Sequence, residues 1–107
     1  MTTFDDRKDA FEKKFAHDEE LRFKANARRN KLLGLWAAEK LGKNGADAEA
    51  YAKSVVMADF QEAGDDDVLR KVKGDLEAGG HAHSDGQIRR VMDDLMQQAI
   101  EEVKAGR

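Results

Sequence analysis

The stretch DEELRFKANARRNKLLGLWAAEKL, which runs from Asp18 to Leu41, decides the fold of this chain of 107 residues. It contains the only tryptophan of the sequence and the longest apolar run, residues 32–38. Asp18 can act as an N-cap, and the two glutamates that follow it suit the positive end of a helix macrodipole. Gly42 then follows as a residue that commonly ends a helix. The stretch therefore predicts one long helix over residues 18–41.

Four apolar residues form a stripe along this predicted helix. Leu21, Ala25, Leu32 and Trp36 fall within about 60° of one another when each residue turns the helix by about 100°. Most of the stability of such a helix comes from packing of its apolar face against other elements. We therefore expect the segments that follow residue 41 to cover this stripe.

Two further helices are predicted after a turn at residues 43–45. Asp47 can cap the first of them, which ends at Gly64. The three aspartates at residues 65–67 open the second, which stops at the glycine pair 79–80. The apolar stripe predicted for this second helix consists of Val68, Leu69, Val72 and Leu76.

The last predicted helix has the clearest pattern of the chain. Ser84 and Gln87 match a capping box, in which the side chain of each residue bonds to the backbone of the other. The apolar residues that follow at helical spacing are Ile88, Val91, Met92, Leu95, Ala99 and Val103. Proline is absent from the chain, and the short connections favour antiparallel neighbours. We predict an all-α fold: a compact four-helix bundle over residues 18–107, preceded by a mobile N-terminal arm, residues 1–17, that can become helical.

The arm carries an apolar stripe of its own. Phe4, Phe11 and Phe15 lie within about 40° of one another in a helix, but their stripe is rotated by about 80–100° from that of residues 18–41. One straight helix cannot bury both stripes against one surface. Either the arm folds back onto the bundle, or its aromatic face docks into a groove of a partner. Because the later helices supply their own apolar faces, we expect the bundle to fold without residues 1–17.

Composition excludes several classes of function. The chain has no cysteine, so it has no disulfide and no thiol chemistry. A formal net charge of −3 gives no overall attraction to nucleic acid or anionic lipid. The sequence shows neither a secretory signal nor an apolar run of membrane-spanning length. We therefore expect a soluble cytoplasmic protein that is monomeric when free, binds no nucleic acid and does not insert into membranes.

The sequence shows no pattern typical of an enzyme. Two histidines and an aspartate in the loop 81–85 lack the helical spacing of a metal motif, so solvated loop side chains are the simpler interpretation. Arg28, Arg29 and Lys31 form a short basic patch, which is either a solvated helix face or a contact for an acidic or phosphate-bearing partner. We predict no catalytic residue, no metal and no cofactor.

Several longer segments carry a resemblance to a known family. They are FDDR at residues 4–7, AFE at 10–12, KFAHDEELRFKA at 14–25, ARRNKLLGLWAA at 27–38 and VMDDLMQQA at 91–99. In these segments, which extend over nearly the whole chain, the sequence resembles the zeta subunit of alpha-proteobacterial F-type ATP synthases.

The resemblance implies an inhibitor of the F1 sector, located in the cytoplasm and peripheral to the inner membrane through F1. In that family a four-helix bundle carries an N-terminal segment that becomes helical on entering a catalytic interface between alpha and beta subunits, beside the gamma subunit. The equivalent segment here is residues 4–16. The partner-binding residues that the resemblance implies are Phe4, Asp5, Asp6, Arg7, Phe11, Glu12, Lys14 and Phe15.

Two other functions remain open at this point. A helical bundle that binds a small ligand, such as a nucleotide, would place Arg28, Arg29 and Lys31 near the phosphates. A general helical adaptor would use the phenylalanine stripe on some other target. Composition and spacing by themselves do not indicate an ATPase as the partner.

Overall fold

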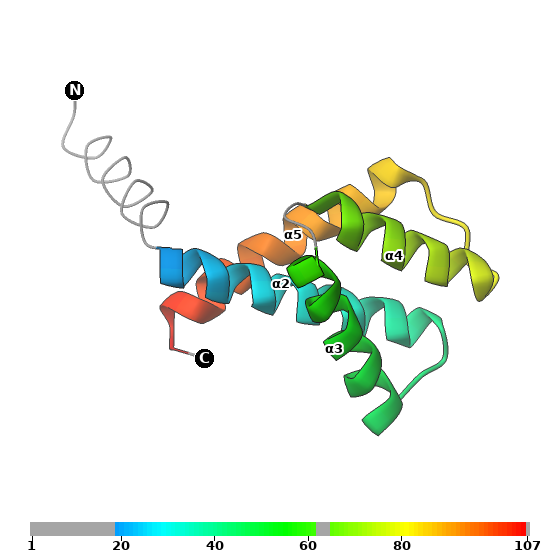
Figure 1. The fold of residues 1–107 in the computed structure, drawn as a ribbon, viewed down its shortest axis with the longest axis horizontal. Helices are drawn as coiled ribbons and strands as arrows, with labels where there is room; N and C mark the ends of the chain where they lie inside the picture. Colours follow the sequence, from blue (N-terminus) through cyan, green and yellow to red (C-terminus); the bar gives the residue numbers. More distant parts are fainter. Residues whose placement is uncertain (1–18, 62–64, 107) are drawn as a thin grey trace.

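The structure, a computed structural model, describes residues 19–61 and 65–106 and forms four α-helices in these ranges (Figure 1). The helices are α2, Glu19–Lys40; α3, Gly45–Gln61; α4, Asp65–Ala78; and α5, Asp85–Lys104. The described residues contain no strand. The predicted all-α fold of four packed helices is confirmed, while the predicted arm, residues 1–17, lies outside the described residues.

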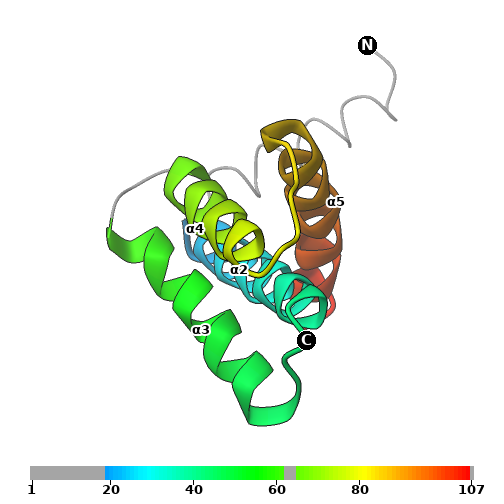
Figure 2. The same cartoon turned by 90° about the vertical axis from the view of Figure 1, so that its right-hand side faces the viewer.

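Helix α2 is the element on which the other helices pack. It contacts α3, α4 and α5, and α4 also contacts both α3 and α5. Figure 2 shows α2 between α3 and α5, with α4 crossing in front of it. All four helices contribute to one buried cluster, which contains Leu33, Ala37, Val55, Val68, Leu69, Val72, Leu76, Ile88 and Met92. The later helices therefore pack against α2, as expected, but they cover the predicted stripe only in part.

The buried face of α2 is wider than the predicted stripe. Of Leu21, Ala25, Leu32 and Trp36, only Ala25 is fully buried, and the other three are half-buried. The fully buried residues of α2 are Ala25, Arg29, Asn30, Leu33, Gly34, Ala37 and Ala38. The predicted stripe was chosen mainly from the large apolar side chains of the helix. Because helices pack on opposite sides of α2, the buried residues include small ones, such as Gly34 and Ala37, and also the polar Arg29 and Asn30.

A glycine allows α2 and α3 to approach closely. A Cβ atom on Gly34 would lie 2.5 Å from the Cα of Ala52 and 3.3 Å from Cγ2 of Val55. The atom at 2.5 Å belongs to the backbone, so no side-chain rotation can relieve the contact. Gly34 therefore sets the distance between the two helices.

The end of α2 follows the prediction. Gly42 has a φ of +76°, in the left-handed region that favours glycine. The amide of Lys43 donates to the carbonyl of Ala38 at 2.9 Å, which satisfies a carbonyl that the helix itself leaves unpaired.

The start of α3 corrects the prediction for Asp47. The helix begins at Gly45, and the carbonyl of Asn44 accepts hydrogen bonds from the amides of Asp47 and Ala48 at 3.2 and 3.4 Å. Gly45 has a φ of +55°, which turns the chain directly into the helix. Asp47 consequently lies in the first turn, where its charge still suits the macrodipole, and is not the N-cap. The predicted end of this helix at Gly64 lies outside the described residues.

Helices α4 and α5 agree with their sequence patterns. The four residues of the predicted α4 stripe, Val68, Leu69, Val72 and Leu76, are all buried. The capping box of α5 is formed: the amide of Gln87 donates to Oγ of Ser84 at 3.1 Å, and the amide of Ser84 donates to Oε1 of Gln87 at 2.9 Å. Of the predicted α5 stripe, Ile88, Met92 and Ala99 are fully buried, and Val91, Leu95 and Val103 are half-buried.

Candidate functional site

The predicted partner-binding residues precede α2 and lie outside the described residues. They are Phe4, Asp5, Asp6, Arg7, Phe11, Glu12, Lys14 and Phe15. Their attachment point to the bundle is the first turn of α2, which begins at Glu19. The surface around the N-terminal half of α2 is therefore the part of the described structure nearest in sequence to the arm.

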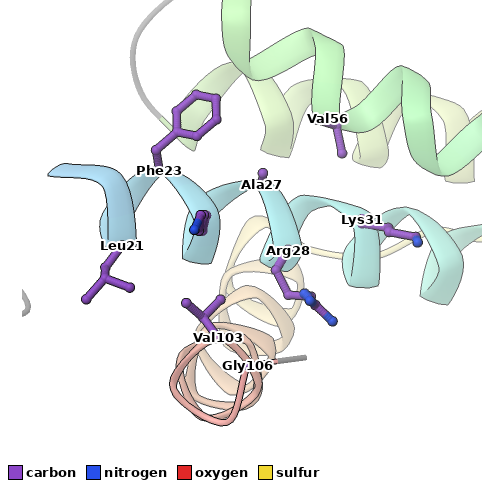
Figure 3. A pocket seen from close by; sticks show the side chains of 9 residues that line it. Leu21, Phe23, Ala27, Arg28, Lys31, Val56, Val103 and Gly106 are labelled. Atoms are coloured by element: carbon purple, nitrogen blue, oxygen red, sulfur yellow. The ribbon is translucent and has the colours of Figure 1, made fainter. Parts of the chain in front are cut away.

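A largely apolar groove of about 590 Å³ lies on this surface, and we call it the α2 groove (Figure 3). Its apolar side chains are Leu21, Phe23 and Ala27 of α2, Val56 of α3 and Val103 of α5. Its cationic side chains are Lys24, Arg28 and Lys31. Figure 3 shows Val56 and Val103 projecting toward α2 from the two neighbouring helices. The groove thus combines an apolar lining with positive charge from one helix.

Phe23 is a residue of this groove that the sequence patterns did not single out. Its exposed fraction is 56%, and the other exposed large apolar residue in the described part of the chain is Met57, at 51%. Phe23 falls outside the stripe formed by Leu21 and Ala25. Helical spacing therefore places it on the polar face of the predicted helix. An aromatic residue on a polar face is the signal that could have identified it, because exposed apolar surface beside cations is typical of interaction sites.

The structure brings two residues of the predicted basic patch together. Arg28 and Lys31 both line the α2 groove. Nη1 of Arg28 donates to Oε1 of Glu102 in α5 at 3.0 Å, while Lys31 is exposed. Arg28 is therefore paired with a carboxylate of α5, and Lys31 is an exposed cation of the groove.

The third residue of the patch, Arg29, lies elsewhere. It is only 2% exposed, so the solvated-face interpretation is wrong for this residue. Its Nη2 donates to Oδ1 of Asp65 at 2.7 Å, and its Nε donates to Oδ1 of Asn30 at 2.8 Å. Asn30 is itself fully buried, and its Nδ2 has no hydrogen-bonding partner among the described residues. Arg29 therefore ties α2 to the start of α4 and does not line the groove.

Replacement of Asp65 by alanine is expected to destabilise the bundle by about 1–2 kcal/mol. The substitution leaves the buried guanidinium of Arg29 without its carboxylate. The side chain of Asp65 is 53% exposed, so solvent screening keeps the loss below that of a fully buried ion pair. Thermal unfolding followed by circular dichroism at neutral pH measures the effect.

This loss should depend on pH and should be specific to Asp65. The hydrogen bond from Arg29 holds the pKa of the Asp65 carboxyl below its usual range. A lowered pKa stabilises the folded state above the ordinary carboxyl pKa, and this contribution disappears as the pH falls through the lowered value. The difference between wild type and variant should therefore shrink below about pH 4. Asp66→Ala is the matched control, since that side chain is 77% exposed and pairs with Arg89 at the surface. Equal losses from both substitutions would contradict this interpretation.

The loop histidines do not form a metal site in the described structure. Among residues 19–61 and 65–106, no three His, Asp or Glu side chains are grouped to hold a metal ion. His81 is exposed, but His83 is half-buried against Trp36, with ring centroids 5.6 Å apart and planes at 72°. Nζ of Lys40 lies 5.0 Å from the centroid of the same Trp36 ring. His81 agrees with the prediction of solvated side chains, whereas His83 is only partly solvated because it packs against Trp36.

A polar contact between α3 and α4 is structural in character. The hydroxyl of Tyr51 donates to Oδ2 of Asp75 at 2.9 Å, and Nζ of Lys71 donates to the same oxygen at 3.1 Å. Burial and the contact with Asp75 raise the pKa of Tyr51 above its usual range. The phenol therefore stays protonated at neutral pH and joins the two helices.

Comparison with solved structures finds a close relative. A protein whose structure was determined by solution NMR is 48% identical to this chain, with a TM-score of 0.71 over 81% of this chain and 99% of that one. A search of the curated proteins gave no match. No helix in the described residues is long and apolar enough to cross a membrane. The resemblance to the zeta subunit is confirmed by the sequence model of the family ATPase inhibitor subunit zeta, which matches residues 1–102: the chain belongs to this family.

Proposed function

We propose that this protein is a regulatory, non-catalytic inhibitor of the F1 sector of ATP synthase. The observation that carries the proposal is its membership of the ATPase inhibitor subunit zeta family. The match covers residues 1–102, so it includes the N-terminal arm and the four helices except for the last two residues of α5. The partner is accordingly the catalytic sector of the synthase.

Within this function, residues 4–16 are the inhibitory segment. The segment becomes helical in a catalytic interface between the alpha and beta subunits, next to gamma. Burial of Phe4, Phe11 and Phe15 contributes on the order of 5–9 kcal/mol gross, at about 1.5–3 kcal/mol each. Ordering the segment costs about 2–5 kcal/mol of this gain. The remainder supports a reversible complex of the helix-in-groove kind.

The four helices act as the folded base of this segment. α2 begins at Glu19, directly after the arm, and is held by helices on both sides. A folded domain at this position limits how far the arm can enter an interface. It also anchors the stripe of Phe4, Phe11 and Phe15 to a folded domain that cannot itself enter the interface between two subunits.

The proposed mechanism has a direction. During rotation the catalytic interface opens and closes, and an arm with different affinities for these states shifts the equilibrium between them. An arm that enters the open interface is trapped when ATP hydrolysis closes that interface around it. The trapped arm then stops the rotor. Rotation in the synthetic direction reopens the same interface and releases the arm.

We therefore expect the protein to suppress ATP hydrolysis much more strongly than ATP synthesis. Inverted membrane vesicles that contain the synthase, assayed in both directions with and without the protein, provide the measurement. Comparable suppression of the two reactions would refute the one-way wedge and would indicate a simple block of the rotor.

A nucleotide-binding bundle is the second candidate function. One observation favours it, namely that Arg28 and Lys31 lie in the same groove. Arg29 does not contribute, because its guanidinium is bonded to Asp65. Removal of residues 1–17 separates the two functions, since the groove remains while the inhibitory segment is lost.

A further inference from the structure

The N-terminal half of α2 has few fully buried residues. Over residues 20–28 only Ala25 is fully buried, whereas the second half of the helix contributes Leu33 and Ala37 to the core cluster. Figure 1 shows the start of α2 beside the end of α5 and away from α4. Apolar packing therefore holds these first turns less than it holds the rest of the helix.

An ion pair joins this half of α2 to the last turn of α5. Nη1 of Arg28 lies 3.0 Å from Oε1 of Glu102, and Nε2 of Gln98 donates to Oε2 of the same carboxylate at 2.7 Å. The side chains of Arg28 and Glu102 are 31% and 18% exposed, so the pair is partly shielded from water and salt. We call Arg28, Gln98 and Glu102 the Glu102 clamp.

The place of Glu102 within its own helix is unfavourable. Helix α5 ends at Lys104, and a negative charge in the last turn is disfavoured by the helix macrodipole. The contact with Arg28 offsets this cost through a bond to another helix. A residue that breaks a local rule in exchange for a tertiary contact is a candidate for a functional role.

We propose that Glu102 is a positioning residue for the inhibition of F1. Through Arg28 it keeps the first turns of α2 on α5, and the inhibitory segment directly precedes these turns. The clamp itself is independent of F1, whereas its effect on inhibition rests on the proposed function. When the turns are docked on α5, the attachment point of the arm is fixed relative to the bundle.

Loss of the clamp should weaken inhibition. Turns that have left α5 must be ordered again when the arm binds, and this loss of conformational freedom opposes binding. If the turns are undocked in about four fifths of the molecules without the clamp, the apparent affinity for F1 is about fivefold weaker.

The neighbouring arginine of α2 provides a matched control. Arg28 is paired with Glu102 in α5, and Arg29 is paired with Asp65 in α4. Asp65→Ala therefore also removes a carboxylate partner of α2, but it leaves the contact with α5 in place. A general loss of stability would weaken inhibition in both variants, whereas a loss of positioning would weaken it only in Glu102→Ala.

Amide hydrogen exchange, recorded by NMR without F1, tests the clamp. In Glu102→Ala the amides of residues 24–28 should exchange about fivefold faster than in the wild type, and those of residues 34–38 should change less than about twofold. The substitution is made at Glu102 because Arg28 has a further interaction. Glu102→Gln keeps one acceptor oxygen and should give an intermediate rate, so it replaces the alanine variant if that variant does not fold. Unchanged exchange at residues 24–28 would overturn the proposal.

Titration of F1 with the same variants tests the positioning role. The half-inhibitory concentration should rise about fivefold for Glu102→Ala and stay within about twofold of the wild type for Asp65→Ala. Equal rises in both variants would overturn the proposal, since stability alone would then explain them.

The two measurements together separate the remaining outcomes. Faster exchange with unchanged inhibition would refute the positioning role and leave the proposed function intact. Weaker inhibition without faster exchange would also overturn the proposal, because Glu102 would then contact F1 itself. A wild-type chain that does not inhibit F1 would refute the proposed function and the positioning role with it, while the exchange rates would still show whether the clamp holds α2.

Discussion

Replacement of Gly34 by alanine is expected to destabilise the bundle by about 1–3 kcal/mol. The added Cβ would lie 2.5 Å from the Cα of Ala52, so α2 and α3 must move apart. Their separation loosens the contacts of Val55, which is fully buried. The better helix propensity of alanine returns about 1 kcal/mol and does not offset the overlap. Unfolding in urea, followed by circular dichroism, measures the change.

The matched control is the same substitution at Gly74. This glycine is also inside a helix, α4, but it is exposed and a Cβ there meets no atom within 4 Å. Gly74→Ala should therefore stabilise the protein by about 0.5–1 kcal/mol. A loss of stability for Gly34→Ala together with a gain for Gly74→Ala would establish close helix packing at Gly34. Stabilisation by both substitutions would show that α2 and α3 are not in tight contact.

Phe11→Ala and Phe15→Ala are each expected to weaken inhibition of F1 by about 1–2 kcal/mol, which is about a five- to thirtyfold higher half-inhibitory concentration. Large aromatic anchors commonly dominate binding when they fill a desolvated groove. The control is Lys8→Ala, which removes a polar side chain from the same segment and should matter far less. Equal effects of all three substitutions would contradict an aromatic binding face. All three residues precede α2 and lie outside the described structure, so these variants also test the division of roles between arm and bundle.

The helices could be predicted from the sequence because their ends are encoded locally. Ser84 with Gln87 and Gly42 act within a few residues of themselves, and the structure forms the caps that they indicate. The start of α3 was misplaced because two local signals competed there. Asp47 resembled an N-cap, but Gly45 with its positive φ lets the chain enter the helix earlier.

The burial of α2 could not be predicted because it depends on how many helices surround it. A helical wheel that assumes packing on one side only predicts that Leu32 and Trp36 are buried, but both are half-buried in the structure. Packing on two sides buries Gly34 and Arg29 instead, and Arg29 is accommodated there by Asp65, which is 36 positions away. A pairing over such a separation leaves no pattern in the sequence.

The candidate site was predictable only in part, for a similar reason. The phenylalanine stripe of the arm is a local pattern and could be identified directly. The α2 groove is formed by side chains of α2, α3 and α5 together, and Phe23 acquires its place only when these helices are assembled. The basic patch was visible in the sequence, but its division into groove residues and a core residue was not.

The most direct test of the central claim is a titration of purified F1, recorded as the rate of ATP hydrolysis. The full chain is compared with residues 18–107, after cooperative unfolding has shown that the shorter chain is folded. We expect hydrolysis to fall to a low plateau as the full chain is added and to stay unchanged with residues 18–107. Unchanged hydrolysis with the full chain, or equal inhibition by the two chains, would contradict the claim that the N-terminal arm inhibits F1.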